Sequence, residues 1–125
     1  MPISRISMRT GKSAAYRSAI LDGVFRVLHD ALGVPDGDEF MVINEHDEVN
    51  FRYGNYLGIE RSADLIYIQV TVFDTRTLAQ KKALYECLAR YLGESPGVRP
   101  EDIFVNVLEA AKENWSLGHG HAQFA

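Results

Sequence analysis

The 125-residue chain has little of several features that mark common protein classes. It has a single cysteine, Cys87, so no disulfide can form within the chain. We expect Cys87, in an apolar helical pattern, to be a small core side chain in a reducing cytoplasm. No apolar run approaches the length of a membrane span, and the first residues lack the apolar centre of a signal peptide. These absences predict a soluble, cytoplasmic protein without a membrane partner.

Basic residues are also few, and they form no block. Lysine and arginine together number 13 against 17 acidic residues, which gives a formal net charge of −4. This balance argues against a nucleic-acid partner. A content of 46% hydrophobic and 24% charged residues is typical of a globular chain. The length suits one domain with one core, and we expect a single domain over residues 1–125.

Two segments have the period of an amphipathic helix. Ser13 can cap a helix over residues 14–32, which Gly33 ends. A second helix begins at a capping-box pair, Thr77 and Gln80, and is expected to end at Gly93. The apolar positions of the two helices recur at helical spacing: Ile20, Val24, Val27, Leu28 and Ala31, then Leu84, Cys87, Leu88, Tyr91 and Leu92.

Four segments are predicted to be strands: the alternating residues after Pro2, then 39–46, 65–73 and 103–109. Residues 39–46 carry apolar side chains on both parities, which predicts a strand covered on both faces. Residues 47–64 have no clear period and are expected to form a long loop with a short hairpin. The segment 111–125 is rich in glycine, histidine and aromatic residues and has no period.

The order strand–helix–strand therefore occurs twice, in halves of about 1–60 and 61–125. The segments GVPDGDEF (33–40) and GVRPEDIF (97–104) are similar and follow the two helices. A helical crossover makes the two strands of each unit parallel. The expected fold is α+β, with two consecutive β-α-β units in a four-stranded mixed sheet and both helices on one face. The other face needs a cover, and we expect an oligomer whose sheets cover one another.

Five stretches along the chain resemble the tautomerase superfamily, and most of all its malonate semialdehyde decarboxylase group. They are Pro2 directly after Met1, Gly11-Lys12-Ser13, GVPDGD (33–38), TVFDTRTLAQK (71–81) and NWSLGHGHAQF (114–124). The resemblance implies a tautomerase-like fold, a catalytic amino-terminal proline, no cofactor and no metal. It also implies a small oxo-acid substrate and a homotrimer.

The resemblance assigns a role to six residues. Pro2 matches the catalytic proline, Asp38 the acid that orients or activates water, and Arg76 an arginine that holds the substrate carboxylate. Three further residues match pocket walls: Trp115, Phe124 and Leu117, the last at a position that is usually aromatic.

Asp74 stands where the family has a second carboxylate-binding arginine. Asp74 can pair with Arg76 and weaken its hold on a substrate, or it can raise the pKa of the proline amine. Both effects would lower the capacity for decarboxylation.

The chemistry of these residues leaves three functions open. A free proline amine can move a proton between carbon and oxygen of an oxo acid, which is keto–enol tautomerisation. The alternative is decarboxylation or hydration of a three-carbon acid, supported by Asp38 and Trp115. If Met1 stays attached, Pro2 is an amide that merely begins a strand, and a non-catalytic, homo-oligomeric binding protein is the third possibility. His119 and His121 lack a third ligand and do not predict a metal site.

Overall fold

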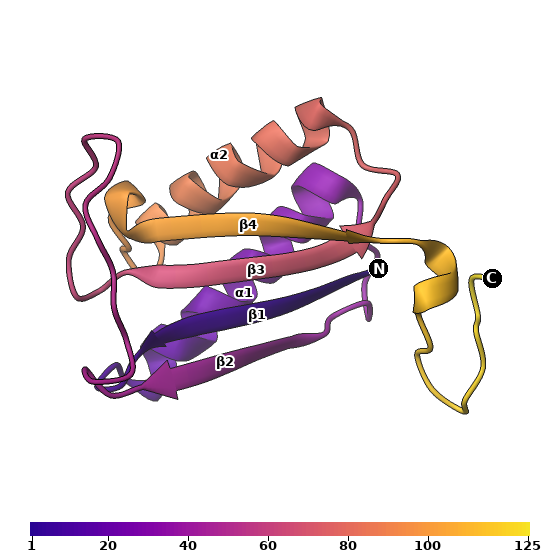
Figure 1. The fold of residues 1–125 in the computed structure, drawn as a ribbon, viewed down its shortest axis with the longest axis horizontal. Coiled ribbons are helices and arrows are strands. Elements are labelled where there is room, and N and C mark those ends of the chain that lie inside the picture. Colours follow the sequence, from indigo (N-terminus) through magenta and orange to yellow (C-terminus); the bar gives the residue numbers. More distant parts are fainter.

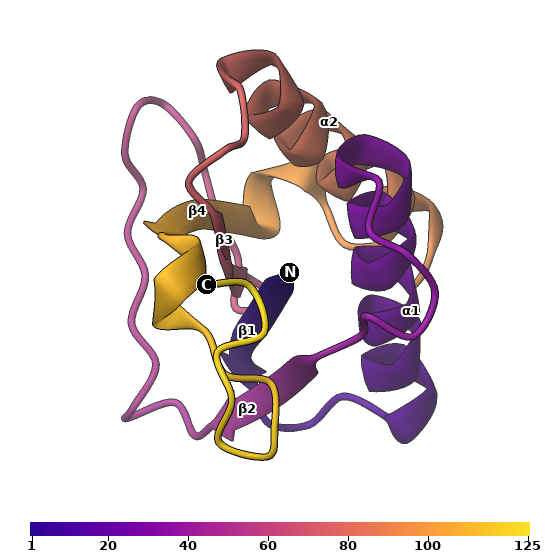
Figure 2. The same ribbon diagram turned by 90° about the vertical axis from the view of Figure 1, so that its right-hand side faces the viewer.

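The computed structural model describes all 125 residues and contains one four-stranded sheet and two long helices. The strands are β1 (Pro2–Arg9), β2 (Met41–His46), β3 (Ile66–Phe73) and β4 (Ile103–Ala110), in the spatial order β2-β1-β3-β4. β1 is parallel to β2 and β3 is parallel to β4, whereas the central pair β1–β3 is antiparallel. Helices α1 (Ala14–Leu32) and α2 (Leu78–Glu94) both cover one face (Figure 1, Figure 2). The predicted fold class is confirmed.

Helix α1 has the bounds that the sequence predicts. The Ser13 Oγ accepts a hydrogen bond from the Tyr16 N–H at 3.1 Å, which satisfies one of the free amides of the first turn. At the other end Gly33 has a φ of 69°, a left-handed conformation in which glycine has no Cβ clash. Both ends are therefore fixed by local chemistry.

Helix α2 begins at the predicted capping box but does not end at Gly93. Thr77 and Gln80 exchange two side chain–backbone hydrogen bonds, of 2.9 and 3.1 Å. The helix continues through Gly93 to Glu94, and Ser95 is the first extended residue. The prediction for Gly93 is wrong because the left-handed glycine of this turn is Gly97, with a φ of 104° and an N–H that bonds the Leu92 carbonyl. No helix combines the length and apolar character needed to span a membrane.

The hydrophobic core lies between the helices and the inner face of the sheet. Alternate residues of β1 and β3 point into it, the pattern of strands with one buried face. A cluster of 16 buried side chains from both halves of the chain makes up this core. Cys87 is a half-buried free thiol that packs against the cluster.

The opposite, outer face of the sheet is open in the single chain. Val42, Phe104 and Leu108 on this face are 45, 45 and 43% exposed. Within one chain β2 is covered on the inner face alone, because both helices lie there, and its cover by another copy of the chain stays a prediction. The centre of the outer face is also polar, since Arg5 and Asn106 both pair with Gln69.

The two irregular segments lie at opposite ends of the sheet. Residues 47–64 form a loop that contains an isolated antiparallel bridge between Tyr56 and Ile59, as the predicted short hairpin requires. After β4 the chain makes a short 3₁₀ turn, Lys112–Asn114, and continues irregularly. This last segment extends beyond the end of the sheet at which the chain begins (Figure 1).

Candidate functional site

Pro2 lies where β1 begins and β3 ends, and it is buried. The α-amine of the preceding Met1 is 3.8 Å from the Asp38 Oδ2. The Met1 and Asp38 side chains are only 7 and 12% exposed. The start of the chain is therefore an enclosed amine beside a carboxylate.

A tight turn brings Asp38 to this position. The Asp38 N–H donates to the Pro35 carbonyl at 3.2 Å, and Gly37 between them has a φ of 85°. Only glycine adopts this backbone conformation readily, which accounts for its place in GVPDGD. The Asp38 Oδ1 is buried and has no hydrogen-bond partner in the chain. That oxygen is free to accept a proton or a hydrogen bond from a ligand.

Arg76 reaches the same region from the segment between β3 and α2. Its Nη1 donates to the Leu32 carbonyl at 2.6 Å, at the last residue of α1. The carbonyl end of a helix attracts a cation, so α1 orients this guanidinium. The Arg76 Nε is buried and unpaired within the chain. The guanidinium therefore keeps donors for an anion such as a carboxylate.

The charge of the amine is set by its surroundings. Burial is the largest effect and lowers the pKa of the Met1 α-amine below its usual value. The Asp38 carboxylate opposes this by stabilising the charged amine, and the nearby Arg76 cation lowers the pKa further. The net effect is a lowered pKa, so the neutral amine, the form that can take up a proton, is more accessible than in an exposed α-amine.

An apolar cavity of about 190 Å³ adjoins the amine. Its walls are Met1, Pro2, Ile3, Phe40, Trp115, Ser116 and Leu117. The cavity brings Pro2 together with two of the predicted pocket residues, Trp115 and Leu117. Ile3, Phe40 and Ser116 were not predicted. The signal for Ile3 and Phe40 was their position on the outer parity of strands that flank the start of the chain.

Four predicted site residues are not among the walls of this cavity. Asp38 and Arg76 lie near the Met1 amine and shift its pKa in opposite directions. Phe124 packs edge-on against Phe73, with ring centroids 5.1 Å apart, and Phe73 packs in the same way against Trp115 at 5.7 Å. Phe73 is thus a further residue that the sequence did not single out. It joins the two aromatic residues of the C-terminal segment to the end of β3.

Asp74 is exposed and forms no ion pair with Arg76. The pKa of the Met1 amine is shifted by burial, Asp38 and Arg76, and not by Asp74. Asp74 is therefore at the edge of the site, where its negative charge faces solvent. His119 and His121 are also exposed, and no group of three or more potential ligands is arranged to hold a metal ion.

Comparison with known proteins gives consistent matches. The profile of a family described as tautomerase enzyme matches residues 38–118. The probable tautomerase YusQ of Bacillus subtilis (strain 168) is 36% identical over 124 residues, covering 98% of both chains.

Two solved structures extend the comparison. A malonate semialdehyde decarboxylase inhibited by 3-bromopropiolate has a TM-score of 0.93 and 30% identity, covering 98% of this chain and 93% of that chain. A protein described as a fused 4-OT symmetric trimer has a TM-score of 0.81 at 19% identity, covering 98% of this chain and 97% of its own, and shares the fold.

Proposed function

The chain belongs to the tautomerase family, and from that premise we propose that it catalyses keto–enol tautomerisation of a small oxo acid without a cofactor, with the Pro2 amine as acid and base. The observation that carries this proposal is the enclosed amine: the α-amine of Met1 is 3.8 Å from Asp38 and adjoins an apolar cavity. Removal of Met1 would leave the Pro2 secondary amine as the first group of the chain in this environment.

Arg76 would bind the substrate carboxylate. Its guanidinium is oriented by the Leu32 carbonyl, and the free N–H groups at the start of α2 add attraction for an anion. The apolar part of the substrate would then contact Phe40, Trp115 and Leu117. This arrangement suits an acid with one carboxylate and an apolar remainder.

The proton transfer balances without any other reagent. The neutral Pro2 amine takes a proton from the carbon next to the carbonyl, and the C–H electron pair forms the enol double bond as the carbonyl oxygen gains charge. The same amine, now protonated, returns the proton to oxygen or to carbon. General acid–base transfer of this kind contributes about 10²–10⁴-fold to a rate.

Decarboxylation or hydration of a three-carbon oxo acid is the second candidate. It is favoured by the unpaired, buried Asp38 Oδ1 beside the amine, which can orient a water molecule. It is also favoured by the 30% identity to a malonate semialdehyde decarboxylase. In this reaction the amine and an aldehyde would form an iminium with loss of water. The iminium would accept the electron pair released as CO₂ leaves.

The test compares wild type with Pro2→Ala on protein whose intact mass shows that Met1 is absent. The substrates are phenylpyruvate enol, malonate semialdehyde and an acetylenic 2-oxo acid. We expect Pro2→Ala to lower kcat/KM at least about 100-fold on the preferred substrate. In wild type, kcat/KM should fall as pH drops through the pKa of the amine, because the protonated amine is no base.

Two results would contradict the proposal. Full activity of Pro2→Ala would remove the amine from the mechanism. Retention of Met1 in protein made without a tag would leave Pro2 as an amide and favour the non-catalytic alternative. Turnover of malonate semialdehyde in preference to the enol would favour the second candidate.

A further inference from the structure

The two halves of the chain share one constant offset of 64 residues. β1 and β3 begin at Pro2 and Ile66 and end at Arg9 and Phe73. The same offset relates the N-caps of the two helices and the left-handed glycines that follow them: Ser13 with Thr77, and Gly33 with Gly97. In the antiparallel pairing of β1 with β3, Arg5 lies opposite Gln69. Gln69 is also the residue that the offset relates to Arg5. The pair therefore marks the centre of an approximate two-fold axis that relates the two halves. The Pro2 cavity must therefore have a counterpart at the other end of the sheet.

That counterpart is a second cavity, of about 330 Å³. Four of its walls are related by the same offset to walls of the Pro2 cavity: Leu65 to Met1, Tyr67 to Ile3, Phe104 to Phe40 and Tyr53 to Leu117. The loop 47–64 here takes the place that the C-terminal segment has at the Pro2 end. The second cavity is the larger of the two.

The counterparts of Pro2 and Asp38 at this end of the sheet cannot take part in acid–base chemistry. Ile66 stands in place of Pro2, and its nitrogen is a backbone amide. Asp102 corresponds to Asp38, but it is fully buried and accepts hydrogen bonds from the Ser62 N–H and Oγ at 2.7 and 2.6 Å. This end therefore has no chain-terminal amine and no unpaired counterpart of Asp38.

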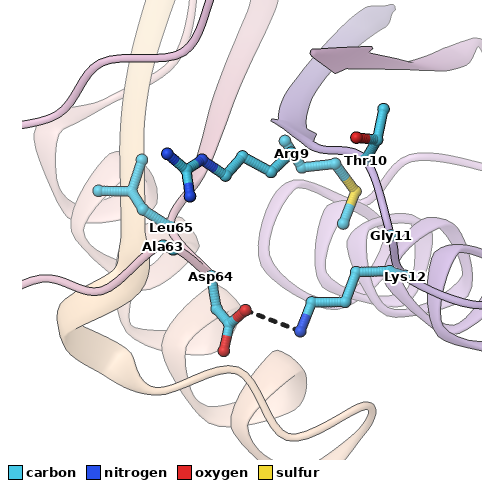
Figure 3. A pocket seen from close by; sticks show the side chains of 8 residues that line it. Arg9, Thr10, Gly11, Lys12, Ala63, Asp64 and Leu65 are labelled. Atoms are coloured by element: carbon cyan, nitrogen blue, oxygen red, sulfur yellow. Dashed lines mark ion pairs between the residues drawn. The ribbon is translucent and has the colours of Figure 1, made fainter. Parts of the chain in front are cut away.

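The cation that corresponds to Arg76 is Lys12, and it is already paired with a carboxylate. Lys12 is held by Asp64 at 2.7 Å, across a separate polar cavity at the end of β1 (Figure 3). The Asp64 carboxylate neutralises the ammonium group, which would otherwise attract an anion. Arg9 also lines that polar cavity, but neither Arg9 nor Lys12 is a wall of the second cavity, so a ligand there needs another counter-charge.

Arg61 supplies that charge in the second cavity. Its guanidinium carbon lies 5.5 Å from the Phe104 ring centroid, and it forms no ion pair. One of its nitrogens, Nη1, donates to the Glu101 carbonyl at 2.8 Å, which leaves other donors of the planar fork free. No carboxylate side chain is among the walls of the cavity. The cavity therefore combines a free cation with a mostly apolar lining.

Four of the eight walls are aromatic. Tyr67 packs edge-on against Phe104 at 5.4 Å, and Tyr53 and Tyr56 line the cavity from the loop. Leu57 at the rim is 80% exposed and has a φ of 58°, a conformation that is costly for leucine. We propose that this cavity binds a small aromatic carboxylate, with the ring among the aromatic walls and the carboxylate on Arg61, and does not transform it.

The test uses phenylacetate, which has no ketone to enolise, and the full-length protein with labelled leucine methyl groups. Leu57 and Leu65 report on the second cavity, and Leu117 reports on the Pro2 cavity. We expect the Leu57 and Leu65 signals to shift and saturate with phenylacetate. Arg61→Gln should raise the Kd for phenylacetate obtained from these signals about tenfold or more, because it removes a charged hydrogen bond. Arg61→Gln should leave the response of the Leu117 signal to phenylacetate unchanged.

Arg52→Gln is the matched control, since Arg52 is exposed in the same loop and is not a wall of the cavity. Tyr53→Ala is a second variant, which keeps Arg61 and its hydrogen bond to Glu101. It should also raise the Kd for phenylacetate obtained from the Leu57 and Leu65 signals. The proposal is overturned if Leu57 and Leu65 do not respond in wild type, as when a second copy of the chain fills the cavity. It is also overturned if neither Arg61→Gln nor Tyr53→Ala changes their curve. Because the readout is binding at Leu57 and Leu65, a failure of catalysis at Pro2 leaves this result unaffected.

Discussion

At the scale of single residues, two of the four buried side-chain atoms that lack a hydrogen-bond partner belong to Asp38 and Arg76, next to the start of the chain. The Asp38 Oδ1 and the Arg76 Nε are both buried without a partner in the chain. A buried polar atom without a hydrogen bond costs about 1–3 kcal/mol, so native proteins retain few of them. Two such atoms, of opposite charge type, near the Met1 amine indicate groups that are kept available for a ligand rather than used in folding.

Asp74→Arg tests the electrostatics at this edge. Asp74 is exposed and does not pair with Arg76, so the substitution breaks no contact that holds the site together. A second cation beside Arg76 would hold a small carboxylate more firmly. We expect turnover of malonate semialdehyde to rise at least about tenfold, the effect of one charged hydrogen bond.

The control for this prediction is Glu86→Arg, which makes the same change of charge at an exposed position on α2. Steady-state kinetics of both variants would separate a local effect from a change in net charge. If Asp74→Arg gives no gain, Asp74 does not limit decarboxylation.

At the scale of elements, the loop 47–64 depends on a buried carboxylate at the start of β4. Asp102 is fully buried, bonds the Ser62 N–H and Oγ, and has Arg99 at 3.8 Å. Arg61 and Arg99 add hydrogen bonds between the same two segments, to the Glu101 and Glu60 carbonyls. These polar contacts fix the end of the loop, whereas Phe51 near its start is buried and packs against Tyr67 of β3.

Ser62→Ala should therefore destabilise the protein. The substitution leaves the buried Asp102 Oδ2 without its hydroxyl donor, which should lower the free energy of unfolding by about 1–3 kcal/mol in urea titrations. Ser18→Ala, on the exposed side of α1, is the control and should change it by less than about 0.5 kcal/mol. Equal effects of the two substitutions would show that the Ser62–Asp102 bond does not stabilise the loop.

The elements also show how far local sequence signals reach. Ser13, Gly33 and the Thr77–Gln80 pair fix helix ends through hydrogen bonds within a few residues, so the sequence predicted them correctly. Gly93 failed as a helix end because a glycine can keep helical backbone. The reversal to the left-handed region occurs at Gly97, where the chain turns toward β4.

At the scale of the whole molecule, the open outer face of the sheet favours assembly. Val42 and Leu108 are large apolar side chains left nearly half exposed on this face. Burying such side chains contributes about 25 cal/mol per Å². We therefore expect copies of this chain to associate through their outer faces, as in the homotrimer that the sequence predicts.

Leu108→Asp should disrupt this assembly, because it would bury an unpaired charge at the interface. We expect sedimentation to give a mass of three chains for wild type and a smaller mass for Leu108→Asp. Tyr85→Asp is the control, because Tyr85 is similarly exposed, at 39%, but lies on α2 on the other side of the sheet. A wild-type protein that sediments as a single chain would refute the trimer.

The sequence by itself determined the order of elements, most of their bounds and the parallel pairing within each unit, because caps, periodicity and crossover rules act over short stretches of chain. Its resemblance to tautomerases also indicated Pro2, Asp38 and Arg76 as residues of one site. Only the tertiary structure decided that Met1 and Asp38 are enclosed together, that Asp74 stands apart from Arg76, and that Phe40 and Ile3 line the cavity. It alone revealed the second cavity at the opposite end. Most of these facts depend on side chains that are far apart in the chain, such as Met1 and Asp38, and local propensity does not encode such contacts.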